Sequence, residues 1–226
     1  MSSLRDAFKE GEIPQELCTH CVKNNEGLTG EWTIIADHRS DGLREITEFF
    51  GLDPRDRTAW EFSLHLNAPR LRLDYIKKGG RSTQKSASNV GSSEGGGPLL
   101  KVTCHGALHA DCPRAILFDG IEKKGYPVRL NFPVVILVAM EELVPHAPLR
   151  HMASGCEDGT FLAAEIDGIL FVKYEMRRGT FYITRILLDR DPSSKERGPI
   201  TLAQYCVITK DGEKHVAHRY HKRVEG

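Results

Sequence analysis

The sequence predicts a mainly β protein, an antiparallel up-and-down barrel with a short helical hairpin as its lid and with inserted loops. In the last third, apolar and polar residues alternate over successive segments, and Asp-Gly or Arg-Gly pairs separate several of them. Helical periodicity is clear only between the first and second expected strands. Because glycine accepts positive φ at little cost, such short connections indicate hairpins, and consecutive hairpins form a meander.

Composition limits the class of protein. The chain has 226 residues, 40% of them hydrophobic, which is enough for one sizeable core. Lys plus Arg and Asp plus Glu number 31 each, so no overall field favours nucleic acid. The polar start lacks a signal-like apolar core, and the longest apolar run, 133–140, is too short to cross a bilayer. We expect a soluble cytoplasmic or nuclear protein with no transmembrane segment and no nucleic-acid partner.

The first expected elements are a helical extension and a strand. Residues 1–27 form an N-terminal helical extension in this prediction, because Leu4, Phe8 and Leu17 recur at loosely helical spacing. The barrel domain then covers residues 28–226. Its first strand follows Gly30, where Trp32 and Ile34 alternate with their neighbours.

A helical hairpin is expected next. Ser40 or Asp41 can cap a helix that ends at Gly51. A second helix is expected over 54–66, where a capping Asp53 and Pro54 at the first helical position begin the pattern. The apolar stripe of the first helix consists of Leu43, Ile46, Phe49 and Phe50.

The period then changes to two, and further strands follow. A strand over 71–75 precedes a Gly- and Ser-rich segment, 79–97, expected to be a flexible insertion. A second insertion is expected around 122–155, where the apolar segment 134–143 fits either a buried strand or a helix. The remaining strands are expected at 99–104, 115–118, 128–130, 161–166, 169–176, 180–188, 202–210 and 214–223.

This order resembles the intracellular lipid-binding proteins, the fatty-acid-binding and cellular retinoid-binding family of the calycin superfamily. Gly30-Glu31-Trp32 opens the first strand, a helical hairpin follows, and hairpins continue to the C-terminus. The resemblance implies ten antiparallel strands in a flattened barrel, lidded by two helices. In many members arginines and a tyrosine inside bind a lipid carboxylate. The family's Arg-x-Tyr is similar to His218-Arg219-Tyr220, with histidine replacing arginine, and its internal arginine is similar to Arg185.

Strand alternation gives an independent argument for a ligand site. His218 and Tyr220 share one face of the last strand, and Arg185 shares a face of an earlier strand with Ile183 and Leu187. If both faces point inward, Arg185, His218 and Tyr220 converge on a ligand carboxylate. The alternative is an outer Arg185 that pairs with a surface carboxylate, beside two ordinary strand residues.

Other chemistries find weaker support. Cys18 and Cys21, with Cys104 and Cys112, could supply four zinc ligands, but the spacing is only half matched, and free thiols are expected instead. No supported catalytic motif occurs, so we expect a non-enzymatic protein without cofactor or metal. Its predicted role is to bind or carry a fatty acid or another small amphipathic ligand. The alternative is a protein-interaction or regulatory barrel with a filled core, with zinc or nucleic-acid binding as variants.

Overall fold

The computed structural model describes residues 3–35, 70–77, 96–106, 109–129, 156–177, 179–190 and 200–224. The predicted helical hairpin, most of the 79–97 insertion and the segment 134–143 lie outside these residues. The proposed domain boundaries therefore remain predictions.

Ten antiparallel strands form one sheet, which confirms the expected mainly β meander. Its order is β4-β3-β2-β1-β10-β9-β8-β7-β6-β5, so the first strand pairs with the last. β5 lies within the second predicted insertion, so at least the start of that segment belongs to the sheet. The strands are β1 Gly30–Ile34, β2 Arg70–Ile76, β3 Leu99–Gly106, β4 His109–Leu117, β5 Lys123–Arg129, β6 Cys156–Ile166, β7 Ile169–Met176, β8 Gly179–Leu188, β9 Thr201–Lys210 and β10 Glu213–Arg223.

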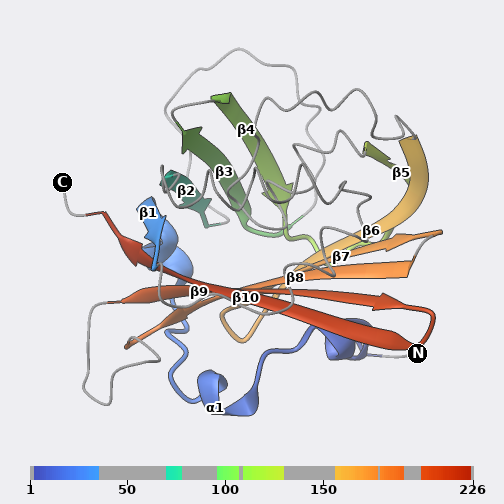
Figure 1. The fold of residues 1–226 in the computed structure, drawn as a ribbon, viewed down its shortest axis with the longest axis horizontal. Coiled ribbons are helices and arrows are strands. Elements are labelled where there is room, and N and C mark those ends of the chain that lie inside the picture. The colour runs from blue at the N-terminus through green and yellow to red at the C-terminus, as the bar shows by residue number, and fades with distance from the viewer. Residues whose placement is uncertain are drawn as a thin grey trace, which may run out of the picture.

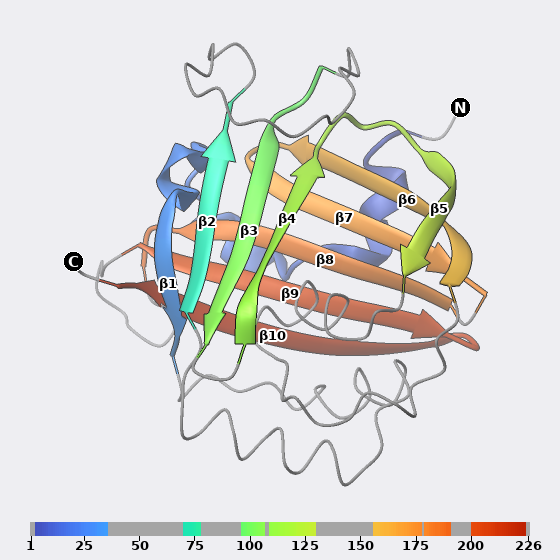
Figure 2. The same ribbon diagram turned by 90° about the horizontal axis from the view of Figure 1, so that it is seen from above.

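The sheet bends into two layers. β1 to β4 form one layer and cross over β6 to β10, as Figures 1 and 2 show. No ladder joins β4 to β5 among the described residues, so the barrel is not closed by strand pairing. The chain after β4 instead reaches β6 through an isolated bridge between Asp119 and Ala164, and Gly120 N donates to Ala163 O at 2.9 Å. This contact links the two layers on the open side.

Two of the hairpin turns that the sequence predicts have the same backbone form. Asp167 and Gly168 join β6 to β7 with φ of 53° and 82°, and Asp211 and Gly212 join β9 to β10 with φ of 53° and 83°. Positive φ at both central residues is typical of the tight turn whose twist matches that of the strands. The Asp-Gly pairs therefore set the register of both hairpins.

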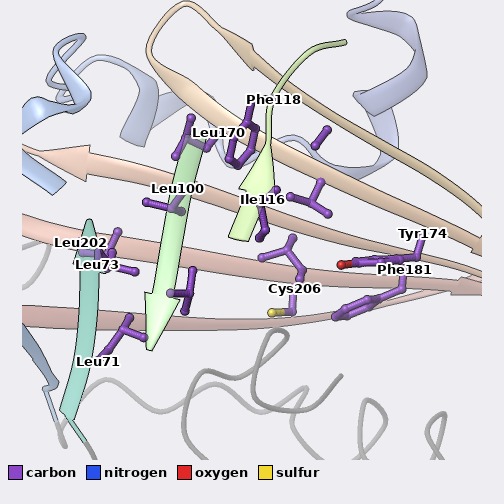
Figure 3. Close-up of a cluster of buried hydrophobic side chains, with 14 of the residues drawn as sticks. Leu71, Leu73, Leu100, Ile116, Phe118, Leu170, Tyr174, Phe181, Leu202 and Cys206 are labelled. Carbon is purple, nitrogen blue, oxygen red and sulfur yellow. The ribbon is translucent and has the colours of Figure 1, made fainter. Parts of the chain in front are cut away.

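Apolar side chains from both layers point into the region between them (Figure 3). Trp32, Leu73 and Leu100 from one layer, and Phe181 and Leu202 from the other, are each 0% exposed and belong to one cluster. We call the faces that carry this cluster the inner faces of the strands. Each Å² of apolar surface that this cluster buries contributes about 25 cal/mol to stability.

A second apolar cluster lies on the outer faces of β6 to β10. It is covered by residues 3–28, here called the N-terminal cover, which contain η1 Asp6–Gly11, α1 Gln15–Cys18 and η2 Asn25–Leu28. Phe8 stacks on Phe171 with ring centroids 5.2 Å apart, and Thr184 Oγ1 donates to Gly11 O at 2.6 Å. The cover is thus packed on the sheet.

The N-terminal cover contains three short helical turns and not one continuous helix. Gly11 and Pro14 interrupt it, and glycine and proline are the residues least suited to a helix interior. Gly11 also lies against Tyr182, whose Cβ would be 2.7 Å from a Cβ at position 11. Within the described ranges, no helix is long and apolar enough to cross a membrane.

Candidate ligand-binding site

A row of directly paired residues crosses the inner face of four strands. Leu170 pairs with Arg185, Arg185 with Gln204, and Gln204 with Arg219. Arg185 is 0% exposed and Gln204 is 1% exposed, among inner-face neighbours such as Ile183 that are apolar. We call Leu170, Arg185, Gln204 and Arg219 the inner row. Its three polar members place hydrogen-bond donors in an otherwise apolar region.

His221 extends this polar region along β10. It pairs with Leu202 of β9 and is 1% exposed. Alternation puts it on the same face as Arg219 and Ala217, and Ala217 belongs to the cluster between the layers. Arg185, Arg219 and His221 therefore form a basic group on the inner faces of β8 and β10.

His218 and Tyr220 lie on the opposite face, so the predicted convergence with Arg185 is wrong. The Tyr220 hydroxyl lies 2.9 Å from the Tyr205 hydroxyl, and the His218 ring stacks on the Tyr205 ring with centroids 5.4 Å apart. Tyr205 and Tyr220 belong to the outer cluster beneath the N-terminal cover. Burial, followed by the hydrogen bond with Tyr220, raises the pKa of Tyr205 well above its usual range.

The error has a physical cause. A shift of one residue in strand phase moves every side chain to the other face. In a strand with one polar face, that face shows which residues point outward. In β9 the N-terminal cover buries the outer face as well, so eight consecutive residues are buried and this signal is missing. Arg219 and His221 are next to the predicted residues in the sequence. The pairing of Ala217 with Cys206, and of His221 with Leu202, shows that this set faces inward.

A polar contact near one end of the inner row joins the two layers. The Tyr75 hydroxyl of β2 donates to Glu165 Oε2 of β6 at 2.8 Å, and Asn25 Nδ2 of η2 donates to Glu165 Oε1 at 2.8 Å. Burial and the bond to Glu165 raise the pKa of Tyr75 far above its usual value. The sequence analysis missed this three-residue contact, because its members are 50 or more residues apart with no local motif.

This contact is continuous with the inner row. Glu165 pairs with Leu170, the first member of the row, at the end of β6 nearest the turn to β7. With about 4.8 Å between neighbouring strands, the Cα atoms of Glu165 on β6 and Arg185 on β8 lie roughly 10 Å apart, two strand spacings across the sheet. The inner faces thus carry an acidic residue held by two donors, and basic residues further along the same row.

The two cysteine pairs considered for zinc belong to different parts of the fold. Cys18 and Cys21 lie in the N-terminal cover against the outer cluster, whereas Cys104 and Cys112 are paired positions of β3 and β4. Burial raises the pKa of both Cys18 and Cys21. In the part of the chain that the structure describes, no three histidine, cysteine or acidic residues gather as a metal site.

Several solved structures have a similar chain path. Fatty-acid-binding protein 1 of Echinococcus granulosus is 14% identical, with 87% of this chain and 97% of that chain covered and a TM-score of 0.42. Human cRBP IV is 11% identical, with 87% and 98% covered and a TM-score of 0.45. Secretory abundant heat soluble protein 4 of Ramazzottius varieornatus is 13% identical, with 88% and 96% covered and a TM-score of 0.43.

No protein-family model matches the sequence. No curated protein matches it either. With TM-scores under 0.5, the likenesses carry no inference about what this chain binds, and the strand order and the site geometry stand on the structure itself.

Proposed function

We propose that this protein binds and carries a small amphipathic molecule with an acidic head group, held between the two layers of the sheet. The observation that supports the proposal is the inner row, in which the fully buried Arg185 lies between Leu170 and Gln204, with Arg219 one strand further. The proposed role is non-enzymatic, and a fatty acid is the simplest ligand of this class.

The chemistry of the head group follows from the donors. Guanidinium groups bind carboxylates through paired, charge-assisted hydrogen bonds, which also fix the orientation of the acid. In this proposal Arg185 remains an anchor, while Arg219 and His221 take the places first given to His218 and Tyr220.

The tail would supply most of the affinity. The inner faces that surround the row carry aliphatic and aromatic side chains from both layers (Figure 3). Each buried methylene contributes about 0.8 kcal/mol, so a long acyl chain offers on the order of 10 kcal/mol before ordering costs. The head group would then decide which class of lipid is bound.

The test compares an acid with its methyl ester. Calorimetric titration of delipidated protein with a fatty acid, and with the ester of the same chain, separates head-group recognition from tail burial. We expect the acid to bind more tightly by roughly 10- to 150-fold, the equivalent of one charge-assisted hydrogen bond of about 1.5 to 3 kcal/mol. Arg185→Met should remove this preference but retain ester binding.

Lys222→Met is the matched control. Lys222 is exposed on the same strand as His221, so the change removes one positive charge without touching the inner row. It should leave the preference for the acid unchanged. Equal affinity for acid and ester in the unaltered protein would contradict the proposal.

A barrel with a filled core is the second candidate. The apolar cluster runs without a break from Trp32 and Leu73 in one layer to Phe181 in the other, and Phe161 and Tyr174 pack with ring centroids 5.2 Å apart. If side chains occupy the whole space, the outer surface carries the function and a protein is the partner. The same titrations then show no saturable uptake of acid or ester.

A further inference from the structure

The segment Cys18-Thr19-His20-Cys21 of the N-terminal cover forms a closed turn. Cys21 N donates to Cys18 O at 3.3 Å, and His20 N donates to Leu17 O at 3.0 Å. A turn of this kind keeps its first and fourth Cα atoms within about 7 Å. A disulfide needs Cα atoms roughly 4.4 to 6.8 Å apart. The backbone therefore brings the two cysteines close enough to be bridged.

Both thiols are free and accessible in part. Cys18 and Cys21 are half-buried, whereas Cys206 on the inner face of β9 is 4% exposed. Burial and then the charge of the nearby Cys18 thiolate raise the pKa of the Cys21 thiol, which agrees with the closeness of the two side chains. Access and proximity distinguish this pair from the buried Cys206.

We propose that Cys18 and Cys21 are a reversible dithiol–disulfide pair, oxidised by thiol–disulfide exchange with a small disulfide such as glutathione disulfide. In the first step one cysteine thiolate attacks the small disulfide, forming a mixed disulfide and releasing one small thiol. The second cysteine thiolate then attacks the protein sulfur of the mixed disulfide and releases the other small thiol. The two cysteines lose two electrons and two protons, and one disulfide becomes two thiols.

The pair lies where the N-terminal cover joins the sheet. Val22 N donates to Leu187 O at 2.8 Å, and Asp189 N donates to His20 O at 3.0 Å, while Cys21 forms an isolated bridge with Leu188. These contacts hold the turn against the end of β8, the strand that carries Arg185. Closing the disulfide would fix the turn at this junction and slow the local opening of the cover.

The chain offers a direct assay in the unaltered, full-length protein. Trypsin cleaves after Lys9 and Lys23, so the peptide 10–23 contains both cysteines and no other. The protein is equilibrated in buffers with an increasing ratio of oxidised to reduced glutathione, quenched with acid and alkylated with N-ethylmaleimide. It is then digested with trypsin, and the masses of the peptides are measured by mass spectrometry. As the buffers become more oxidising, we expect the doubly alkylated peptide to be replaced by the internal disulfide form, which lacks two hydrogens and carries no N-ethylmaleimide group. Treatment with dithiothreitol before alkylation should restore the doubly alkylated peptide.

Two controls, Cys206 and a Cys18→Ser variant, and one further measurement accompany this assay. Cys206 lies in the tryptic peptide 198–210 and should stay reduced in the folded protein under the same buffers, because it is buried. Cys18→Ser should leave Cys21 able to form only a mixed disulfide with glutathione. Amide hydrogen exchange of residues 18–23 should be slower in the oxidised protein.

Several results would overturn the proposal. One is a peptide 10–23 that stays fully alkylated at every redox poise. Another is a peptide that carries glutathione on both cysteines and no internal disulfide. A third is oxidation confined to the other cysteines. If hydrogen exchange is unchanged by an internal disulfide, the pair exists but the link to the cover is wrong.

Discussion

Gly168 and Gly212 provide a matched test of how the N-terminal cover meets the barrel. Both are the second residue of an Asp-Gly turn, with φ of 82° and 83°. A Cβ at position 212 would meet nothing within 4 Å, whereas one at position 168 would lie 2.7 Å from Lys23 Cα and 2.8 Å from Lys23 O. Alanine at either site carries the same backbone strain, and only at 168 does it also collide with the cover.

The expected magnitudes follow from this difference. Left-handed backbone costs a non-glycine residue roughly 1 to 2 kcal/mol, which is the whole effect for Gly212→Ala. Overpacking against a backbone that must move adds about 1 to 3 kcal/mol for Gly168→Ala. Urea unfolding followed by fluorescence gives both free energies, and hydrogen exchange of residues 20–25 shows whether the cover has moved.

One outcome would refute the reasoning. If the two alanine variants lose the same stability, within about 0.5 kcal/mol, and exchange in 20–25 is unchanged, then Lys23 does not lie against the turn as the structure places it. A larger loss at Gly168 with faster exchange in the cover is the result that the structure predicts.

Three further perturbations test other contacts. Phe8→Ala should lower the free energy of unfolding, measured in urea, by about 3 to 5 kcal/mol, because Phe8 is 1% exposed and stacks on Phe171. The loss is smaller if the N-terminal cover detaches from the sheet in the variant. Leu4→Ala, at a site that is 42% exposed, should change the same free energy by less than about 0.5 kcal/mol. Tyr75→Phe removes the hydroxyl that donates to Glu165 and should lower the same quantity by about 1 to 3 kcal/mol, a result that an unchanged midpoint would contradict. Burial and the hydrogen bond with Tyr220 raise the pKa of Tyr205 in the folded state. The contribution of this shift to stability is therefore present below pH about 10, where unfolded tyrosine titrates, and is lost as the pH rises further. In urea unfolding between about pH 8 and 11, the free energy of unfolding of Tyr205→Phe should fall less steeply with pH than that of the unaltered protein.

The strands were predictable because local signals define them. Alternation located most of the described strands, although β5 was expected only at 128–130, and the Asp-Gly pairs at 167–168 and 211–212 located two hairpin turns, since positive φ at both residues strongly selects such pairs. The strand ends were less accurate. β4, for example, begins at His109 although only 115–118 has an apolar signal.

The site was harder to predict because it depends on strand phase and on register. The family resemblance pointed to Arg185, and alternation placed it on one face with Ile183 and Leu187, a face that the structure buries between the layers. His218 and Tyr220 were assigned to the wrong face, since the face of β10 that carries Val216 and Tyr220 is the more apolar one in the sequence, although it is the outer face. Gln204 became visible only through its pairing with Arg185, a relation between residues 19 positions apart.

Native mass spectrometry of the protein purified from its own cells, before and after denaturing extraction, tests the central claim most directly. We expect one amphipathic acid bound per chain, lost on extraction, and regained by the refolded protein from a fatty-acid solution, with an affinity that Arg185→Met lowers to that of the methyl ester. A protein that carries no such molecule when purified, and takes up none after refolding, would contradict the carrier function and favour a filled core.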